Sequence, residues 1–193
     1  MKKILLVALL GLFTSAVLAQ TKGQSTVGTG FSTYKYSDSS NGYNNKSTNF
    51  SLNYGLFVKD NARLGLDLGF TNYDYSYNSP YKETTNTTNL GLNYKKFYPI
   101  AGKFYWTLAE AASYGWGDKE VNNSGTITTG KVETMNANVV AGLSYFLSKR
   151  FMIESDGIGL YLNSSKTKST TNVSKNSSFS FNNYLGLRLN FIF

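Results

Sequence analysis

The last fifteen residues of the chain, 179–193, constrain its fold more than any other stretch. They read FSFNNYLGLRLNFIF, in which every second position is apolar with one exception. Alternation with a period of two is typical of a β-strand that has one oily face and one polar face. A one-residue slip would place Arg188 in the oily row, so the alternation fixes which face is which. The oily face either packs against a second sheet or, in a transmembrane barrel, faces lipid.

The N-terminus has the pattern of a secretory signal peptide. Two lysines are followed by a mostly apolar run that ends at residue 17, and Ala19 precedes polar Gln20. A basic start, an oily centre and a small residue at the end are typical of such a peptide. We therefore predict cleavage between Ala19 and Gln20, giving a signal peptide (1–19) and one mature domain (20–193). A membrane-anchoring helix is the alternative, but the run is shorter than the ~20 residues that a span requires.

Composition favours strands over helices in the mature chain. The mean hydropathy is −0.27, and no later run approaches the ~18 apolar residues of a transmembrane helix. Aromatic residues make up 16% of the chain, which suits the aromatic girdles of membrane barrels. Cysteine is absent, so an exported protein of this sequence must be stabilised without disulfides.

Alternating segments recur along the whole chain, and the connections between them are long and short in turn. Bacterial barrels have an even number of strands, short periplasmic turns and longer outer loops. We therefore predict an all-β, eight-stranded antiparallel closed transmembrane barrel, with polar loops at 38–47, 118–130 and 163–177. The predicted strands are 24–37, 48–59, 63–77, 84–98, 104–117, 131–147, 151–162 and 179–193.

Three strands have an uncertain phase. The apolar residues of 24–37 do not share one face, which leaves the facing of this strand open. In 104–117 the apolar row includes Glu110, and we predict a bulge near residues 109–112 that turns Glu110 inward. In 151–162 the apolar positions change from odd to even, so Gly157 or Gly159 is expected to host a bulge.

The chain resembles the small outer-membrane β-barrel proteins of Gram-negative bacteria, with the transmembrane domain of outer-membrane protein A as the nearest type. The resemblance rests on the architecture, the signal peptide and the aromatic end of the last strand. It implies localisation in the cell outer membrane and recognition of the last strand by the barrel-assembly machinery. The positions that match this assembly signal are Leu185, Leu187, Leu189, Phe191 and Phe193.

The residue types limit the chemistry available. Histidine and cysteine are both absent, which excludes Ser-His and Cys-His nucleophilic pairs and the usual zinc sites. Outer-membrane barrel enzymes that act on lipids resemble this class but depend on a histidine. We therefore expect no catalytic residue, no metal and no cofactor, and interpret the protein as a non-enzyme.

The charged residues of the polar faces admit two interpretations, an acid/base set or an internal salt-bridge cluster. We favour the cluster, because small barrels fill their interiors with side chains and buried charges need partners. Arg188→Ala is then expected to lower the unfolding temperature in detergent. The predicted lumen charge cluster is Arg63, Asp67, Lys95, Glu110, Glu154 and Arg188, with Asp156 as a further carboxylate.

The formal charge of +8 indicates anionic partners. For an exported chain we expect outer-membrane lipid and lipopolysaccharide, contacted by basic loop residues such as Lys166, Lys168 and Lys175, rather than nucleic acid. The tyrosines at 73–81 are interpreted as part of the upper aromatic girdle and barrel rim, with stacking against sugars as the alternative.

Three hypotheses for function remain. The first is a monomeric barrel with a structural or surface-interaction role: membrane integrity, adhesion, or binding through extracellular loops. The alternatives are a narrow porin-like channel for small solutes and a soluble, exported, lipocalin-like barrel with an oily lumen. Outward side chains would favour lipid, and inward ones the soluble barrel, at Leu64, Leu66, Leu68, Leu187 and Leu189.

Overall fold

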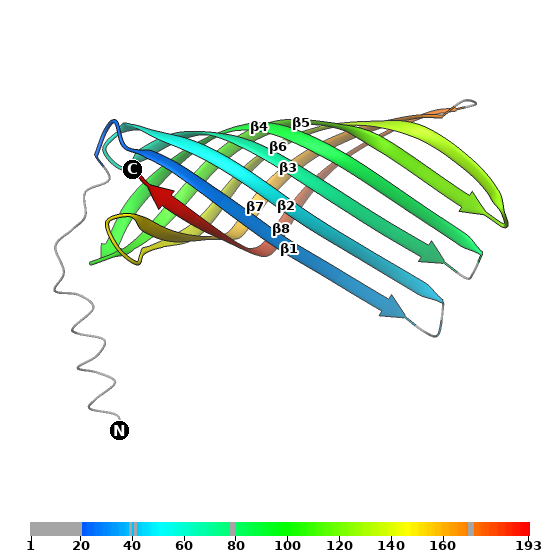
Figure 1. Cartoon of the computed structure of the whole chain (residues 1–193), viewed down its shortest axis with the longest axis horizontal. Coiled ribbons are helices and arrows are strands. Elements are labelled where there is room, and N and C mark those ends of the chain that lie inside the picture. Colours follow the sequence, from blue (N-terminus) through cyan, green and yellow to red (C-terminus); the bar gives the residue numbers. More distant parts are fainter. Residues whose placement is uncertain (1–20, 39, 41, 78–79, 170–171) are drawn as a thin grey trace, which may run out of the picture.

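The computed structural model describes residues 21–193 apart from 39, 41, 78–79 and 170–171, and no side chains at 183–185. Eight strands, each hydrogen-bonded to the next and the last to the first, form one closed antiparallel barrel (Figure 1). This confirms the predicted barrel; the signal peptide and its cleavage site between Ala19 and Gln20 lie outside the described residues. The strands are β1 (Ser25–Asp38), β2 (Tyr43–Lys59), β3 (Ala62–Tyr77), β4 (Tyr81–Ala101), β5 (Phe104–Asn123), β6 (Thr126–Phe146), β7 (Phe151–Ser169) and β8 (Val173–Ile192).

The apolar rows of the strands form a belt on the outside of the barrel. Leu64 and Leu66 of β3 are 47% and 49% exposed, and Leu187 of β8 is 60% exposed. Leu189 is exposed as well, and Leu68 is half-buried in the same row. The hypothesis of a soluble barrel with an oily lumen is therefore wrong, because its leucines would have to point inward. Within the described residues, no helix is long and apolar enough to cross a membrane.

The strands are longer than the sequence predicted. The predicted loops at 38–47, 118–130 and 163–177 are instead mostly the paired ends of β1 with β2, of β5 with β6 and of β7 with β8. The β5–β6 connection is only Ser124 and Gly125, both with positive φ (54° and 89°). These segments resembled loops because they are polar on both faces, as expected for a sheet with water on both sides. The strand extensions, as we call them, are residues 32–38, 43–49, 71–77, 81–89, 117–123, 126–134, 163–169 and 173–178.

A bulge at Gly157 confirms one of the predicted phase changes. Gly142 of β6 pairs with Asp156 and Ala141 pairs with Ile158, so Gly157 is the extra residue of β7. A Cβ on Gly157 would lie 2.9 Å from the Ala141 carbonyl oxygen, which favours glycine at this position.

The bulge predicted near residues 109–112 is wrong. β5 pairs with both neighbours without a register shift from residue 104 to residue 123, apart from the turn at its start. Glu110 therefore stays in the outward row, opposite Tyr94 of β4 and Val139 of β6, and is exposed. A bulge would have interrupted two continuous hydrogen-bond ladders, whereas small Ala109 and Ala111 fit the inward positions beside it.

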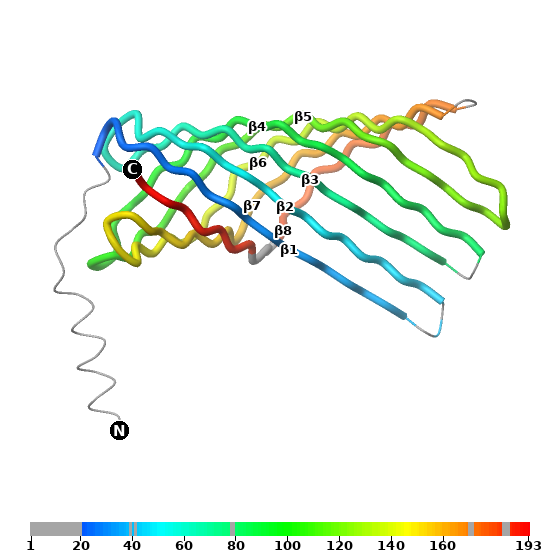
Figure 2. Tube along the Cα trace, viewed as in Figure 1, coloured from blue at the N-terminus to red at the C-terminus, as the bar shows by residue number. Residues whose placement is uncertain are grey.

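The junction between β1 and β8 closes the barrel over a short length only. Five residues of β1, Thr26–Gly30, pair with Arg188–Ile192 of β8, whereas β1 pairs with β2 over its full length. Beyond Gly30 the two strands diverge, as the cartoon and the tube both show (Figures 1 and 2). We call the divergent segment, above Gly30 and Arg188, the β1–β8 gap.

Candidate functional site

A buried glutamate lies inside the barrel near the end with the short turns. Glu154 of β7 accepts hydrogen bonds from Arg63 of β3 (Nη2–Oε2, 2.9 Å) and from Asn190 of β8 (Nδ2–Oε2, 2.9 Å). Lys95 Nζ of β4 lies 3.2 Å from the other carboxylate oxygen. None of these four residues is more than 2% exposed. They tie four strands together across the lumen, and the buried carboxylate has the partners that it needs.

Two glycines provide the space for this ion-paired group. A Cβ on Gly55 would lie 2.5 Å from Arg63 Cδ, and a Cβ on Gly28 would lie 2.2 Å from Asn190 Oδ1. Both glycines occupy inward positions of their strands. The absence of a side chain at these positions of β1 and β2 therefore permits Arg63 of β3 to cross the lumen and leaves room for Asn190 of β8 beside Gly28.

A layer of apolar side chains fills the lumen between Glu154 and the short turns. Phe57 and Phe97 lie with ring centroids 5.5 Å apart, and Tyr105 meets Phe146 edge to face at 5.3 Å. The Arg63 guanidinium lies over the Phe97 ring, which joins this layer to the ion pairs. We call the two layers together the lumen plug. Its apolar members are Phe57, Phe97, Tyr105, Phe146, Met152 and Ile192.

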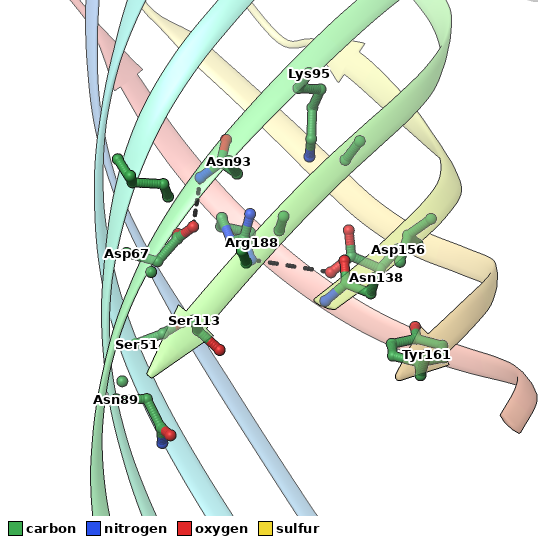
Figure 3. A pocket seen from close by; sticks show the side chains of 17 residues that line it. Ser51, Asp67, Asn89, Asn93, Lys95, Ser113, Asn138, Asp156, Tyr161 and Arg188 are labelled. Carbon is green, nitrogen blue, oxygen red and sulfur yellow. Dashed lines mark hydrogen bonds and ion pairs between the residues drawn. The ribbon is translucent and has the colours of Figure 1, made fainter. Parts of the chain in front are cut away.

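A polar cavity of about 280 Å³ lies on the other side of Lys95 (Figure 3). Arg188 of β8 extends into it and lies 3.9 Å from Asp156 of β7. The Asn93 amide donates a hydrogen bond to Asp67, but Asn93 Oδ1 and Asp67 Oδ1 have no hydrogen-bond partner among the described residues. Asn93 is only 7% exposed. The cavity is thus lined by buried acceptors and by charges of both signs.

The structure divides the predicted lumen charge cluster into three groups. Arg63, Lys95 and Glu154 meet in the plug, as described above. Asp67 and Arg188 line the cavity, each with a different partner. Glu110 does not belong to the lumen at all, and its inclusion was wrong because β5 keeps one phase throughout. Of the assembly-signal positions, Leu187, Leu189 and Phe193 point outward and are exposed, Phe191 is half-buried, and the side chain of Leu185 lies outside the described residues.

The apolar layer and Asn190 were not among the predicted site residues. Each plug aromatic occupies the phase that is polar elsewhere in its strand, next to a short turn, as Phe57 does before Lys59 and Phe146 before the turn at 147–150. An oily residue in the polar phase at one end of several strands is the signal that would have revealed the plug. Asn190 is one polar residue of an alternating strand, and its contact with Glu154 has no local signature.

Four tyrosines form a row at the far end of the lumen. Tyr43 of β2 meets Tyr36 of β1 and Tyr75 of β3 edge to face, and Tyr75 meets Tyr81 of β4, with centroids 5.3–5.9 Å apart. Tyr75 shares the strand phase of lumen-lining Asp67, so the row lies on the inner face. Tyr75 and Tyr81 therefore lie on the inner side of the barrel rim and do not belong to an aromatic girdle that faces lipid. Burial raises the pKa of Tyr81, as does its hydrogen bond to Glu83.

Lysines cluster on the outer face of β6, β7 and β8. Lys168 opposes Lys131 across β6–β7, and Lys166 opposes Lys175 across β7–β8. Glu133 accepts a hydrogen bond from Lys168 at 2.8 Å, which lowers the pKa of Glu133 and raises that of Lys168. We call Lys131, Lys166, Lys168 and Lys175 the outward lysine row. It lies next to a surface groove of about 490 Å³ that includes the belt residues Met135, Leu162 and Phe179.

No group of three or more acidic, histidine or cysteine residues that could hold a metal ion occurs in the ranges of the chain that the structure describes. Glu154, the most deeply buried carboxylate among them, is already engaged by Arg63, Lys95 and Asn190.

Known proteins share this fold. The match with the N-terminal barrel domain of Pseudomonas aeruginosa OprF covers 90% of this chain and 100% of that domain, with 15% identity and a TM-score of 0.51. The match with the attachment invasion locus protein Ail of Yersinia pestis covers 90% of this chain and 100% of Ail, with 12% identity and a TM-score of 0.54. The match with Neisserial surface protein A covers 87% of this chain and 95% of that protein, with 16% identity and a TM-score of 0.52. These identities are low, so the likeness concerns the fold.

No curated protein matches the sequence. Residues 5–191 match the family described as the outer membrane protein beta-barrel domain, so the chain belongs to this family, and its place is the cell outer membrane.

Proposed function

We propose that the protein is a monomeric, non-enzymatic and non-conducting barrel that acts through its strand extensions, which form its extracellular end. The observation that carries the proposal is the lumen plug. Buried ion pairs and six apolar side chains fill the periplasmic end of the lumen, with Phe57 and Met152 at 0% exposure. A hydrated solute would have to displace both layers, so the plug argues against the porin-like alternative.

Planar-bilayer recordings test the absence of conduction. We expect purified, refolded protein to give no steady open-channel steps. The faster migration of the unheated barrel on a gel serves as the control that folded protein was present. Steady steps from such a preparation would favour the porin-like channel and overturn the non-conducting assignment.

The strand extensions offer a surface for binding outside the membrane. The tyrosine row spans β1 to β4 and faces the inner side of the extended sheet, where its rings are half-buried or exposed. Planar rings with a hydroxyl at the rim suit sugar rings, which present an apolar face and polar edges. We therefore propose carbohydrate of a neighbouring cell surface as the ligand of this row.

Glycan binding by cells that display the protein tests this assignment. Tyr43→Ala combined with Tyr75→Ala should abolish the binding, because it removes the centre of the row. Tyr75→Phe, which keeps the ring, should retain most of it. Tyr114→Ala, on the lipid-facing side of β5, is the matched control. Unchanged binding in the double variant would refute the role of the row.

Lipopolysaccharide is the proposed membrane partner of the outward lysine row. Glu133 and Asp118 neutralise only some of its charge, through ion pairs with Lys168 and Lys131 respectively. The excess positive charge lies at the upper edge of the apolar belt, where the phosphates of an outer leaflet lie. The apolar groove beside it, lined by Met135 and Phe179, suits an acyl chain.

A further inference from the structure

We propose that the β1–β8 gap is a lateral entrance through which the uncharged, hydroxyl-rich head of a membrane glycolipid enters the lumen, while its acyl chain stays in lipid. This inference goes beyond the proposed surface role and does not depend on it. It rests on the short closure of the wall, on a cavity within the gap, and on the chemistry of the lumen behind it.

The wall of the barrel is interrupted at membrane depth. The next outward pair after Thr29 and Leu189, in the register of the closed segment, would be Phe31 and Leu187, but these two do not pair. Both are among the most exposed apolar side chains, at 63% and 60%. The opening therefore has apolar side chains on both edges, at the height of the belt, where an acyl chain can contact them.

A second cavity occupies the gap itself. Its volume is about 130 Å³, and it is lined from one side by β1 and β2 and from the other by β7 and β8. Three of its lining residues, Ser51, Asp156 and Arg188, also line the larger lumen cavity. The two cavities thus adjoin, and both members of the Arg188–Asp156 ion pair, which Figure 3 shows, line each of them.

The lumen cavity suits an uncharged polar group. Its charged lining residues, Asp67 and Asp156 against Lys95 and Arg188, balance, so neither a cation nor an anion is favoured by net charge. Asn93 Oδ1 and Asp67 Oδ1 are acceptors without a hydrogen-bond partner among the described residues, and hydroxyl groups are donors that would satisfy them. The remaining lining includes serine, asparagine and tyrosine side chains, which both donate and accept: Ser51, Asn89, Ser113, Asn138 and Tyr161.

The plug determines what such an entrance can do. Lys95 belongs both to the plug and to the cavity wall, so the cavity ends at the buried ion pairs. A head group that enters from the side is therefore held in the outer half of the lumen and does not continue to the periplasm. The inferred activity is glycolipid binding rather than transport.

Engineered cross-links across the two strands test the entrance, because the chain has no cysteine of its own. Phe31→Cys with Leu187→Cys spans the gap, whereas Thr29→Cys with Leu189→Cys spans the paired segment of the same two strands, on the same face. In phosphatidylcholine vesicles, this control pair should form a disulfide on mild oxidation. The gap pair should require a short bismaleimide bridge, since a disulfide needs Cβ atoms within ~4.5 Å.

The probe is a dodecyl glucoside with a photoactivatable group on the sugar, added to these vesicles. We expect it to label lumen peptides of the unbridged protein and of the bridged control, and to lose this labelling when the gap pair is bridged. Lumen labelling by the same photoactivatable sugar without the alkyl chain should be unchanged by the bridge, because this sugar enters only through the extracellular end of the barrel. A dodecyl carboxylate with the same photoactivatable group should label the lumen weakly.

Three results would overturn the proposal. The first is spontaneous disulfide formation in the gap pair at the rate of the control pair, which would show a continuous wall. The second is lumen labelling by the dodecyl glucoside that persists after bridging. The third is equal labelling by the carboxylate, which would contradict the assigned head group. None of these results bears on conduction or on glycan binding by the extensions.

Discussion

Arg63 and Glu154, separated by 91 residues in the chain, meet at 2.9 Å inside the barrel, each no more than 2% exposed. They come from β3 and β7, four strands apart in a ring of eight, so the pair bridges opposite walls. Arg188 lies on a strand next to that of Glu154 but is 3.9 Å from its carboxylate partner Asp156, and its side chain is 23% exposed. The Arg63–Glu154 pair is therefore shorter and far more buried than the Arg188–Asp156 pair.

Arg63→Ala should destabilise the barrel far more than Arg188→Ala. Removing one partner of a buried pair leaves an uncompensated charge and costs about 3–5 kcal/mol, whereas a half-exposed pair contributes about 1 kcal/mol or less. Urea unfolding in lipid vesicles, followed by tryptophan fluorescence, measures both. Equal losses of unfolding free energy would contradict the central role of the plug.

Glu110→Leu should stabilise the barrel. Glu110 lies on the lipid-facing side of β5, between Trp106 and Trp116, and a carboxylate there is penalised by roughly 1–2 kcal/mol relative to an apolar side chain. The same unfolding assay should show an increase of that size. Glu120→Leu, on the same face but in the strand extension, is the control and should give no gain. A loss of stability in Glu110→Leu would indicate a function for the carboxylate at the lipid face.

The outward lysine row should bind polyanions with a defined pH dependence. The Glu133 carboxylate has a pKa below the ordinary 4.5 because of Lys168, so it stays charged as the pH falls to that value and is protonated only below it. Protonation adds one positive charge to the row. Binding of dextran sulfate, which stays anionic throughout, should therefore be unchanged between pH 7 and pH 4.5 and should tighten at lower pH.

Two variants check this assignment at neutral pH. Glu133→Gln should tighten polyanion binding without any change of pH, and Lys166→Gln combined with Lys175→Gln should weaken lipopolysaccharide binding and reduce its salt dependence. Lys22→Gln, near the periplasmic turns, is the control. Tightening of wild-type binding already between pH 7 and pH 4.5 would place the titrating group elsewhere.

Removal of Phe193 should impair assembly in the outer membrane more than a change at Phe179. Both side chains face outward on β8 or at its end, with 63% and 67% exposure, but only Phe193 belongs to the assembly signal that the family resemblance implies. The fraction of heat-modifiable barrel in the membrane measures assembly. Comparable defects in the Phe193 deletion and in Phe179→Ser would argue for a general hydrophobic requirement instead.

Much of the fold follows from local alternation. The outward facing of Leu187 follows from the alternation, because a period of two has only two possible phases and the other phase would place Arg188 in lipid. The row that contains Leu64 alternates in the same way. The phase change in β7 predicted a bulge, and Gly157 is the residue that provides it. These features depend on neighbours in the sequence, which a single chain reveals.

The features that could not be predicted depend on distant residues. The facing of Glu110 is decided by the continuous pairing of β5 with β4 and β6, although its own sequence suggested a bulge. The contact of Glu154 with Asn190 joins separate strands inside the lumen. The strand extensions within 43–47, 118–130 and 163–177 were missed because water on both faces removes the alternation from which strands are recognised.

The extra residue at position 157 also governs how the gene can change. With Gly157 present, β7 shows Glu154 to the inside and Leu160 and Leu162 to the outside. Deleting Gly157 would straighten the strand without turning it over, because Asp156 and Ile158 already pair with consecutive residues of β6, Gly142 and Ala141. Deleting a residue of the regular stretch above it, such as Gly159, would instead turn Leu160 and Leu162 into the lumen and present Tyr161 to the bilayer. Descendants of this sequence are therefore expected to tolerate a gain or loss of one residue at position 157 and to keep the length of the stretch that follows it.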